Sequence, residues 1–412
     1  MKSLKKYTAI FLCACLLLGA GSCDTAEEPA ETDENDPALT AVTDENGTPV
    51  TDEEGNMIAV EPEAEETVYK VGFLYNLGVG EGATAKIFEN ARLQIERTLG
   101  LETCYIENVL VSEIPAAVYE LQENGCNIIV SCSPRFNNSI VKEAKAATET
   151  HFINFGGSTK AFNLSSFGGE LYQTASVCGI AAAYNTETNV LGVVADPSSY
   201  NAYGIVDSYV LGAKEIWGVQ TDVRLNWVWS NDHAQVEAAV DDLIKQGSDV
   251  IMCYTETDHA AEYAASRGVR VIANSCDLPE LIPDSYLTGF FFNASTFIVD
   301  TVRAICAEVF VSSVSEGGIA AGTARLLELS ENCKEGTAEI CAKLYDYIKS
   351  GQAYIFTGEI KNRDNEIMVD KGQRMSFSGV RDIDWLIQGI TAVGDFTTVT
   401  YELKPSDLAI KK

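Results

Sequence analysis

From Val68 onward, short apolar runs rich in β-branched and aromatic residues alternate with longer segments in which apolar residues recur every three or four positions. The short runs predict buried strands, and the longer segments predict amphipathic helices. Strands are expected at 69–76, 103–107, 127–132, 151–155, 164–167, 190–195, 223–228, 249–254, 269–273 and 286–292. Helices are expected at 114–124, 138–148, 170–184, 202–217, 233–246, 258–267, 295–313 and 337–350, besides one that ends near Gly100. This alternation is typical of α/β proteins with parallel sheets.

The strand–helix pattern restarts near Val190, and roughly 345 residues are too many for one hydrophobic core. We therefore predict two similar lobes, each a parallel sheet flanked by helices, with a hinge made of crossing strands. The first lobe is expected to contain residues 67–186 and 279–313, and the second residues 187–278 and 314–412.

A cleft between these lobes is the predicted binding site. Ligands of open parallel sheets lie beyond the carboxyl ends of the strands, so the loops after Asn76, Cys132, Tyr254 and Ala273 are expected to line it. One of these loops contains three glycines at 78–82 and could be taken for a phosphate-binding loop. It lacks the lysine and the spacing of such a loop, and its glutamate would repel an anion. A tight turn that brings backbone amides to a neutral ligand is the preferred interpretation.

The first 23 residues resemble a bacterial lipoprotein signal peptide. Three lysines precede a short apolar stretch, which ends in the segment Ala20-Gly21-Ser22-Cys23. Such a stretch is too short to span a bilayer comfortably. Cys23 is expected to carry the lipid and to become the mature N-terminus. Plain secretion, with Cys23 a chance residue, is the alternative.

Residues 24–66 hold sixteen acidic residues and no lysine or arginine, which predicts an extended, disordered tether. A small hairpin module within this segment is the alternative. Residues 67–412 keep 44 acidic and 26 basic residues, a net charge of −18. That balance argues against a nucleic-acid partner and against electrostatic binding to anionic lipid beyond the anchor itself.

Nine of the twelve cysteines belong to the folded part of the chain. They show no CxxC motif, no zinc spacing and no disulfide pattern, so most are predicted to be buried free thiols. Cys333 and Cys341 are the one pair for which a bridge remains open.

Catalysis has little support in the sequence. The only histidines are His151, His233 and His259, and none lies at metal-ligand spacing from another. No nucleophile elbow, zinc motif or kinase-like loop is present. We therefore predict no enzyme activity, no cofactor and no metal.

The most specific motif is near the end of the chain and consists of GQAYIFTGEIKNRDN (351–365), Gly372 and DWLIQG (384–389). Three further stretches of note are at 71–82, 227–250 and 287–293. Together these motifs resemble those of the basic membrane lipoproteins, the substrate-binding components of nucleoside-type ABC importers.

This resemblance implies a type I periplasmic-binding-protein fold, in which a purine base stacks between aromatic rings and polar side chains contact the base edge and the ribose. The family's first-loop aromatic residue falls on Thr84, which cannot stack, and its aspartate after the third strand falls on Asn138. Asp277 lies in the loop where the family has carboxylates near the sugar. The expected ligand-binding residues are Asn76, Glu81, Thr84, Ser133, Phe136, Asn138, Trp229, Glu256, Asp277, Phe292 and Asn293.

The sequence thus predicts the solute receptor of an ABC importer, anchored by its lipid on the extracytoplasmic face of the cell membrane. Its partners would be a small solute, with a purine nucleoside favoured, and the permease subunits. A ligand-binding sensor lipoprotein, a receptor for another polar solute such as a sugar, and a surface adhesin are the alternatives.

Overall fold

The computed structural model describes residues 40–41, 59–60, 67–218 and 222–393, within two compact units, Met1–Thr67 and Val68–Lys412. In the first unit, β1 (Thr40–Ala41) pairs antiparallel with β2 (Ala59–Val60). This pair lies inside the segment interpreted as a tether. The signal peptide, Cys23 and the remainder of the tether lie outside the described residues.

The second unit begins with a lobe built on a six-stranded sheet whose neighbouring strands are all parallel. The strand order is β13 (Val314–Gly317), β7 (Leu164–Gly169), β6 (His151–Phe155), β5 (Ile128–Ser131), β3 (Lys70–Leu74) and β4 (Glu102–Ile106). The helices of this lobe are α1 (Ala83–Leu99), α2 (Ile114–Glu123), α3 (Asn137–Ala146) and α9 (Ser295–Cys306), with the short 3-10 helices η1 (Val111–Glu113) and η2 (Pro134–Phe136).

The second lobe is built on a seven-stranded sheet in which only β14 runs antiparallel to its neighbour. The strand order is β14 (Ala324–Leu326), β12 (Tyr286–Phe292), β11 (Arg270–Ala273), β10 (Val250–Tyr254), β8 (Leu191–Ala195), β9 (Val223–Trp227) and β17 (Ile390–Val393). Its helices are α4 (Tyr172–Asn185), α5 (Ala202–Trp217), α6 (His233–Lys245), α7 (His259–Ser266), α8 (Leu278–Leu281) and α10 (Thr337–Lys349). The hairpin of β15 (Thr357–Lys361) and β16 (Ile367–Arg374) and the helix α11 (Phe377–Arg381) complete the unit.

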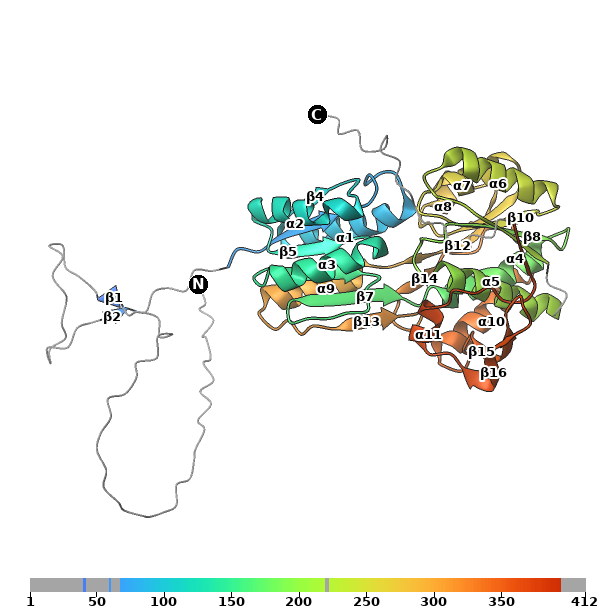
Figure 1. Ribbon diagram of the computed structural model, residues 1–412. Coiled ribbons are helices and arrows are strands. Elements are labelled where there is room, and N and C mark those ends of the chain that lie inside the picture. The colour runs from blue at the N-terminus through green and yellow to red at the C-terminus, as the bar shows by residue number, and fades with distance from the viewer. Residues whose placement is uncertain (1–39, 42–58, 61–66, 219–221, 394–412) are drawn as a thin grey trace, which may run out of the picture. The chain divides into compact units, whose positions relative to one another are not determined.

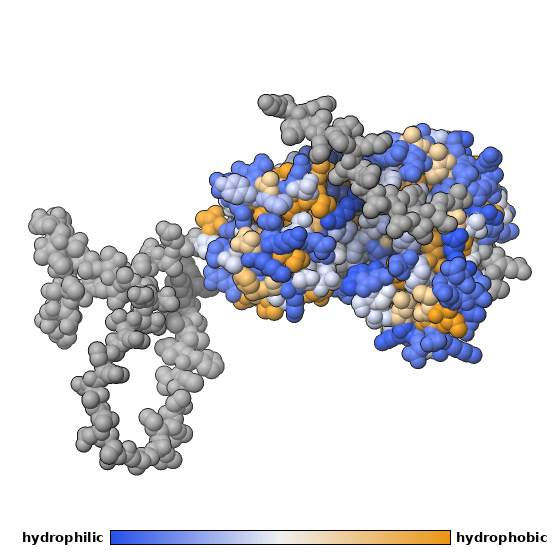
Figure 2. Space-filling model, viewed as in Figure 1, coloured by the Kyte–Doolittle hydropathy of each residue, from blue (hydrophilic) through white to orange (hydrophobic). Residues whose placement is uncertain are grey.

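Burial explains why these segments form these elements. The central strands β5, β8 and β10 are buried along their whole length, as parallel strands covered on both faces must be. Helix α1 buries one stripe of residues and exposes the other. On the face seen in Figure 2, hydrophilic residues predominate and hydrophobic residues form small separate groups. Among the described residues, no helix has both the length and the apolar character needed to cross a bilayer.

The two-lobe α/β architecture agrees with the prediction, but the strands belong to different lobes than expected. β12 pairs with β11 in the second sheet, although residues 279–313 were assigned to the first lobe. β13 pairs with β7 in the first sheet, although residues from 314 onward were assigned to the second lobe. Figure 1 shows α9 and β13, in orange, beside the green β7.

Helix α4 also lies in the second lobe, where it packs on α5, α10 and β12. Within the described part of this unit, the chain therefore crosses between the lobes three times, after β7, after β12 and after β13. The expected first boundary at residue 186 is wrong, because the crossing comes before α4 and not after it.

All nine described cysteines are free. The Cys333 thiol donates to the Leu287 carbonyl (3.6 Å), whereas the Cys341 thiol donates to the Val177 carbonyl (3.9 Å). The bridge left open between these two residues is therefore not formed in the structure.

Two glycines allow α4 and α5 to touch backbone to backbone. A Cβ at Gly179 would lie 2.0 Å from the Tyr209 carbonyl oxygen, and a Cβ at Gly212 would lie 1.8 Å from the Ser176 carbonyl oxygen. No side chain fits at either distance, so the second lobe depends on glycine at both positions.

We predict that Gly179→Ala and Gly212→Ala each lower the free energy of unfolding by about 1–3 kcal/mol or more, because the added methyl group forces the helices apart. Urea denaturation monitored by circular dichroism measures this. Gly80→Ala is the control, since a Cβ there meets nothing within 4 Å. Equal stability of all three variants would contradict the close-packing argument.

Candidate functional site

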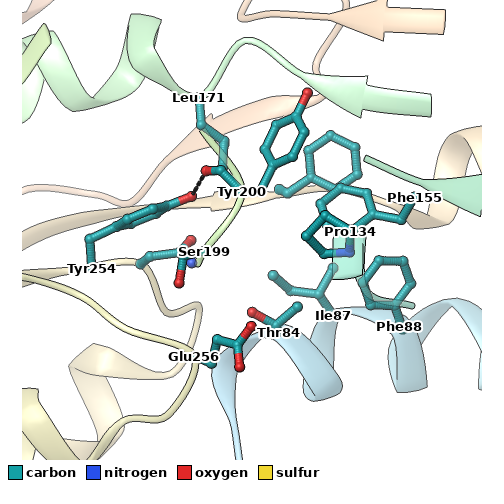
Figure 3. Close-up of a pocket in the computed structure, with 12 residues that line it drawn as sticks. Thr84, Ile87, Phe88, Pro134, Phe155, Leu171, Ser199, Tyr200, Tyr254 and Glu256 are labelled. Carbon is teal, nitrogen blue, oxygen red and sulfur yellow. Dashed lines mark hydrogen bonds between the residues drawn. The ribbon is translucent and has the colours of Figure 1, made fainter. Parts of the chain in front are cut away.

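A pocket lies between the two lobes, where the carboxyl ends of both sheets face each other (Figure 3). The first lobe contributes Thr84, Ile87, Phe88, Pro134 and Phe155; the second contributes Ser199, Tyr200, Tyr254, Glu256, Asn274 and Phe292; and Leu171 comes from the crossing between them. The cavity measures about 30 Å³, which is room for about one water molecule. The lobes therefore lie close together, and any larger occupant requires them to separate.

Aromatic rings form one wall of this pocket. The Phe155 ring lies 5.1 Å from those of Phe88 and Tyr200 and 5.2 Å from that of Phe292, measured between ring centroids. Phe155 ends a strand of the first lobe, whereas Phe292 ends a strand of the second. The wall thus extends across both lobes. Flat rings of this kind can stack on a planar ligand.

Glu256 is the main polar group opposite this wall, and its side chain points toward Thr84 across the pocket in Figure 3. It follows β10, is 7% exposed, and accepts a hydrogen bond of 3.3 Å from the Asn76 side-chain amide of the first lobe. The guanidinium of Arg135, also from the first lobe, lies 3.4 Å away. Burial raises the pKa of Glu256 to about 7, since it outweighs the opposite effects of Arg135 and Asn76, and the nearby Asp196 raises the pKa further.

Asp196 fixes the loops around Glu256. Its carboxylate is 1% exposed and accepts hydrogen bonds from the backbone amides of Ser198 and Ser230 and from both hydroxyls. The Ser230 hydroxyl in turn accepts a 2.9 Å bond from the Glu256 amide. Arg135 reaches the same network, with 3.8 Å to the Asp196 carboxylate and a hydrogen bond to the Ser198 hydroxyl. The network therefore holds Glu256 in place and bridges the lobes.

Lys86 of α1 makes a second bridge between the lobes. Its ammonium group lies 3.0 Å from the carboxylates of both Asp258 and Asp277. Burial lowers the pKa of Lys86, but the hydrogen bonds to the two carboxylates outweigh it and raise the pKa to about 12. Lys86 is therefore a charged anchor of the first lobe on the second.

Two polar atoms of the second lobe point into the pocket region without a partner. Among the described residues, the Ser199 hydroxyl and the Asn274 side-chain oxygen are buried and accept or donate no hydrogen bond. A buried polar group without a partner costs roughly 1–3 kcal/mol. These atoms are therefore suited to a ligand that supplies hydrogen bonds.

The structure brings together some of the residues predicted from the sequence. Asn76, Thr84, Glu256 and Phe292 meet at the pocket, whereas Asp277 does not line it and forms an ion pair with Lys86 between the lobes.

Phe136 and Asn138 lie elsewhere. The Phe136 side chain is 1% exposed and packs in the core formed by α2, α3 and β5, so it cannot contact a ligand in the cleft. Asn138 is exposed on α3, whereas its neighbour Asn137 accepts a 2.7 Å hydrogen bond from Asn154. The prediction was one residue away from the asparagine that faces inward.

The other four expected residues make local contacts. The Glu81 carboxylate accepts from the Gly78 amide, Ser133 caps η2, Asn293 contacts the Thr296 hydroxyl, and Trp229 lines a separate shallow depression with Asn231, Asp232 and His233. None of these four lines the pocket between the lobes.

Sequence reasoning missed Lys86, Arg135, Asp196 and Asn274. Asp196 directly follows β8 and Asn274 directly follows β11, so the rule of strand carboxyl ends could have found both. No local signal marks Lys86, which lies on an ordinary amphipathic helix. Among the described residues, no group of three or more His, Cys, Asp or Glu side chains could hold a metal ion.

A family model and two known proteins match more than half of this chain. The family model described as ABC transporter substrate-binding protein, PnrA-like (Bmp), matches residues 70–310. A purine-binding protein of Brucella abortus is 24% identical over 340 residues, which cover 81% of this chain and 96% of that protein. A putative ABC transporter glucose-binding protein of Haloferax volcanii is 21% identical over 300 residues, covering 72% and 76%.

The fold has solved counterparts. An ABC transporter solute-binding protein from Aeropyrum pernix superposes with a TM-score of 0.60 at 16% identity, over 71% of this chain and 93% of that one. This confirms the two-lobe fold of periplasmic solute-binding proteins that the sequence predicts.

The raised pKa of Glu256 predicts a pH-dependent stability. The neutral carboxyl is favoured in the folded protein, so its contribution is complete below the ordinary pKa of 4.5 and is lost as pH rises through about 7. We expect the free energy of unfolding to fall between pH 5 and 8 by on the order of 2 kcal/mol more in the natural protein than in Glu256→Gln. Denaturant titrations at each pH measure this.

The exposed Glu262→Gln in α7 is the matched control and is expected to follow the natural protein. A Glu256→Gln variant with an unchanged pH profile would contradict the assignment.

Proposed function

We propose, from the premise that this chain belongs to the Bmp family of PnrA-like ABC transporter substrate-binding proteins, that its cleft binds a purine nucleoside and delivers it to a permease. The purine-binding relative from Brucella abortus, which aligns over nearly its whole length, supports this ligand class. Binding without catalysis is part of the proposal.

The main observation in support of a purine nucleoside is that an aromatic wall and polar atoms face each other across the same pocket. Phe155 and Phe292 offer ring faces, and stacking on a base contributes roughly 1–3 kcal/mol. Glu256, Asn274 and Ser199 lie on the second-lobe side. Their oxygen atoms can pair with the N–H groups of a base or with ribose hydroxyls. Such a site discriminates strongly against analogues that lack those groups.

The charges around the cleft favour a nucleoside over a nucleotide. Four second-lobe carboxylates lie where the lobes meet, and Glu256 among them lines the pocket. Among the described residues of the first lobe, Lys86 and Arg135 are the cations that pair with them. Both cations are already engaged, so a phosphate group would meet uncompensated negative charge. A neutral ligand with several hydrogen-bond donors suits this environment.

Binding requires the lobes to open, since a cavity of about 30 Å³ cannot hold a nucleoside. The three strand crossings are the natural hinge. Closure around the ligand would form a continuous surface from parts of both lobes, and we propose that the permease recognises this surface. A sensor that presents the same surface to a membrane receptor is the alternative.

A sugar is the second candidate ligand. The Haloferax volcanii relative is named a putative glucose-binding protein, and aromatic rings with carboxylates and amides also suit sugar hydroxyls. The same binding experiment separates the two classes.

We further propose the lipid anchor at Cys23. Replacing Cys23 with Ser removes the thiol that would be acylated, so the variant is expected to leave the membrane fraction. Cell fractionation with immunodetection, together with mass spectrometry of the N-terminal peptide, measures this. A Cys15→Ser variant is the matched control and should stay membrane-bound. Unchanged fractionation of the Cys23 variant would refute the anchor.

The ligand proposal predicts that purine nucleosides raise the Tm of the purified protein, whereas glucose, ribose and amino acids do not. At a concentration 100 times the Kd, the stabilisation should be about 2.7 kcal/mol. We expect Asn274→Leu to weaken nucleoside binding at least tenfold in calorimetric titrations, because the partner of a buried hydrogen bond is lost.

Asn231→Leu, an exposed asparagine outside the pocket, is the control and should bind normally. A shift with glucose and none with any nucleoside would replace the ligand class. Normal binding by Asn274→Leu would remove this residue from the site.

A further inference from the structure

Two cysteines at the edge of the first lobe lie in sulfur-to-sulfur contact. The Sγ atoms of Cys104 and Cys126 are 2.9 Å apart. Among the nine described cysteines, no other two sulfur atoms lie within hydrogen-bonding distance of each other. Cys104 belongs to β4, and Cys126 lies between α2 and β5.

The sheet itself explains why these thiols meet. β3 lies between β4 and β5, and Gly72 of β3 is directly opposite Cys104. A Cβ at Gly72 would lie 3.2 Å from the Cys126 sulfur and 2.8 Å from the Leu121 side chain. Because glycine leaves this place open, the thiols approach each other across the middle strand.

We propose that Cys104 and Cys126 are a site of oxidative modification, in which a thiol oxidant joins them as a disulfide. With glutathione disulfide as the oxidant, the Cys104 thiolate attacks one glutathione sulfur and releases one glutathione thiolate. The Cys126 thiolate then attacks the Cys104 sulfur of the mixed disulfide and releases the second. The protein loses two protons and two electrons, and glutathione disulfide becomes two glutathione thiols.

Accessibility sets the order of these steps. Cys104 is partly exposed and can meet the oxidant, whereas Cys126 is 3% exposed and its sulfur is in contact with that of Cys104. Burial, together with the hydrogen bond and the charge interaction with Cys104, raises the pKa of the Cys126 thiol. The second step should therefore become faster as pH rises.

The Cys104–Cys126 disulfide would link the edge strand β4 to the segment that precedes β5. β4 is the terminal strand, and the loop between the two cysteines contains α2 and Glu107. The Glu107 carboxylate accepts a 2.6 Å hydrogen bond from the Val79 amide, in the loop that leads to α1 at the cleft. A crosslink that closes this loop restricts the unfolded chain and so stabilises the lobe.

The test is to incubate the purified full-length protein with glutathione disulfide and to map its thiols by alkylation and peptide mass spectrometry. We expect a peptide linked through Cys104 and Cys126, a rise in Tm of about 3–8 °C, and reversal of both by dithiothreitol. Cys104→Ser should lose the linked peptide and the Tm rise.

Cys306→Ser, which replaces another half-buried cysteine, is the matched control and should retain both. Glutathione that stays attached to Cys104 without forming the crosslink would overturn the proposal. So would a Tm rise that persists in Cys104→Ser. Neither outcome depends on whether the cleft binds a nucleoside.

Discussion

The arrangement of the cleft depends on an unequal pairing of charges across it. Two cations of the first lobe meet four carboxylates of the second: Lys86 and Arg135 face Asp196, Glu256, Asp258 and Asp277. When the lobes close, these six groups lose part of their contact with water, and the carboxylates outnumber the cations. This excess of buried negative charge costs free energy unless one carboxyl takes up a proton. Glu256 is the group in this position, because it is buried beside Asp196 and shares a single arginine with it.

Much of the fold could be predicted because burial leaves a clear period in the sequence. The bounds of β6, α5 and β12 coincide with those expected from the pattern, and the other expected elements differ by one or two residues, except α9, which ends seven residues before its expected end. The strands from β13 onward were not expected, because most of them are short and less regular in pattern. Lobe membership could not be predicted this way, because a buried strand has the same pattern in either sheet. Helix α4 shows the limit: it is buried on nearly all sides, so its sequence does not indicate which neighbour it covers.

The closing motif gains a physical reason from the structure. Gly358, Gly372 and Gly389 all have positive φ angles, of 110°, 78° and 102°. Side chains other than glycine rarely adopt such angles. These glycines of the motif therefore meet backbone requirements in β15, in β16 and directly before β17, and none of them lines the pocket between the lobes.

Residues of the candidate site were predictable where the strand topology alone places them at the cleft. Asn76 and Glu256 follow strands whose carboxyl ends face the other lobe, and both meet in the cleft. The rule that ligands bind beyond the carboxyl ends of strands does not predict which way a side chain points once a helix begins. Phe136 ends η2 and Asn138 lies in the first turn of α3, and the side chain of Phe136 turns into the core while that of Asn138 turns to solvent.

The small cavity places a constraint on any ligand. A solute shifts the balance between open and closed lobes only by the difference in its affinity for the two. In the closed lobes, Asn76 and Arg135 contact Glu256 directly. A ligand that separates these groups must therefore offer them equivalent interactions. It needs a group that can hydrogen-bond to the Glu256 carboxyl and an acceptor for the Arg135 guanidinium, besides a flat face for Phe155 and Phe292. A heteroaromatic base has donors and acceptors on its edge and two apolar faces. A sugar meets the polar requirement but covers less of the rings, so the aromatic wall is the feature on which the proposal of a base over a sugar depends.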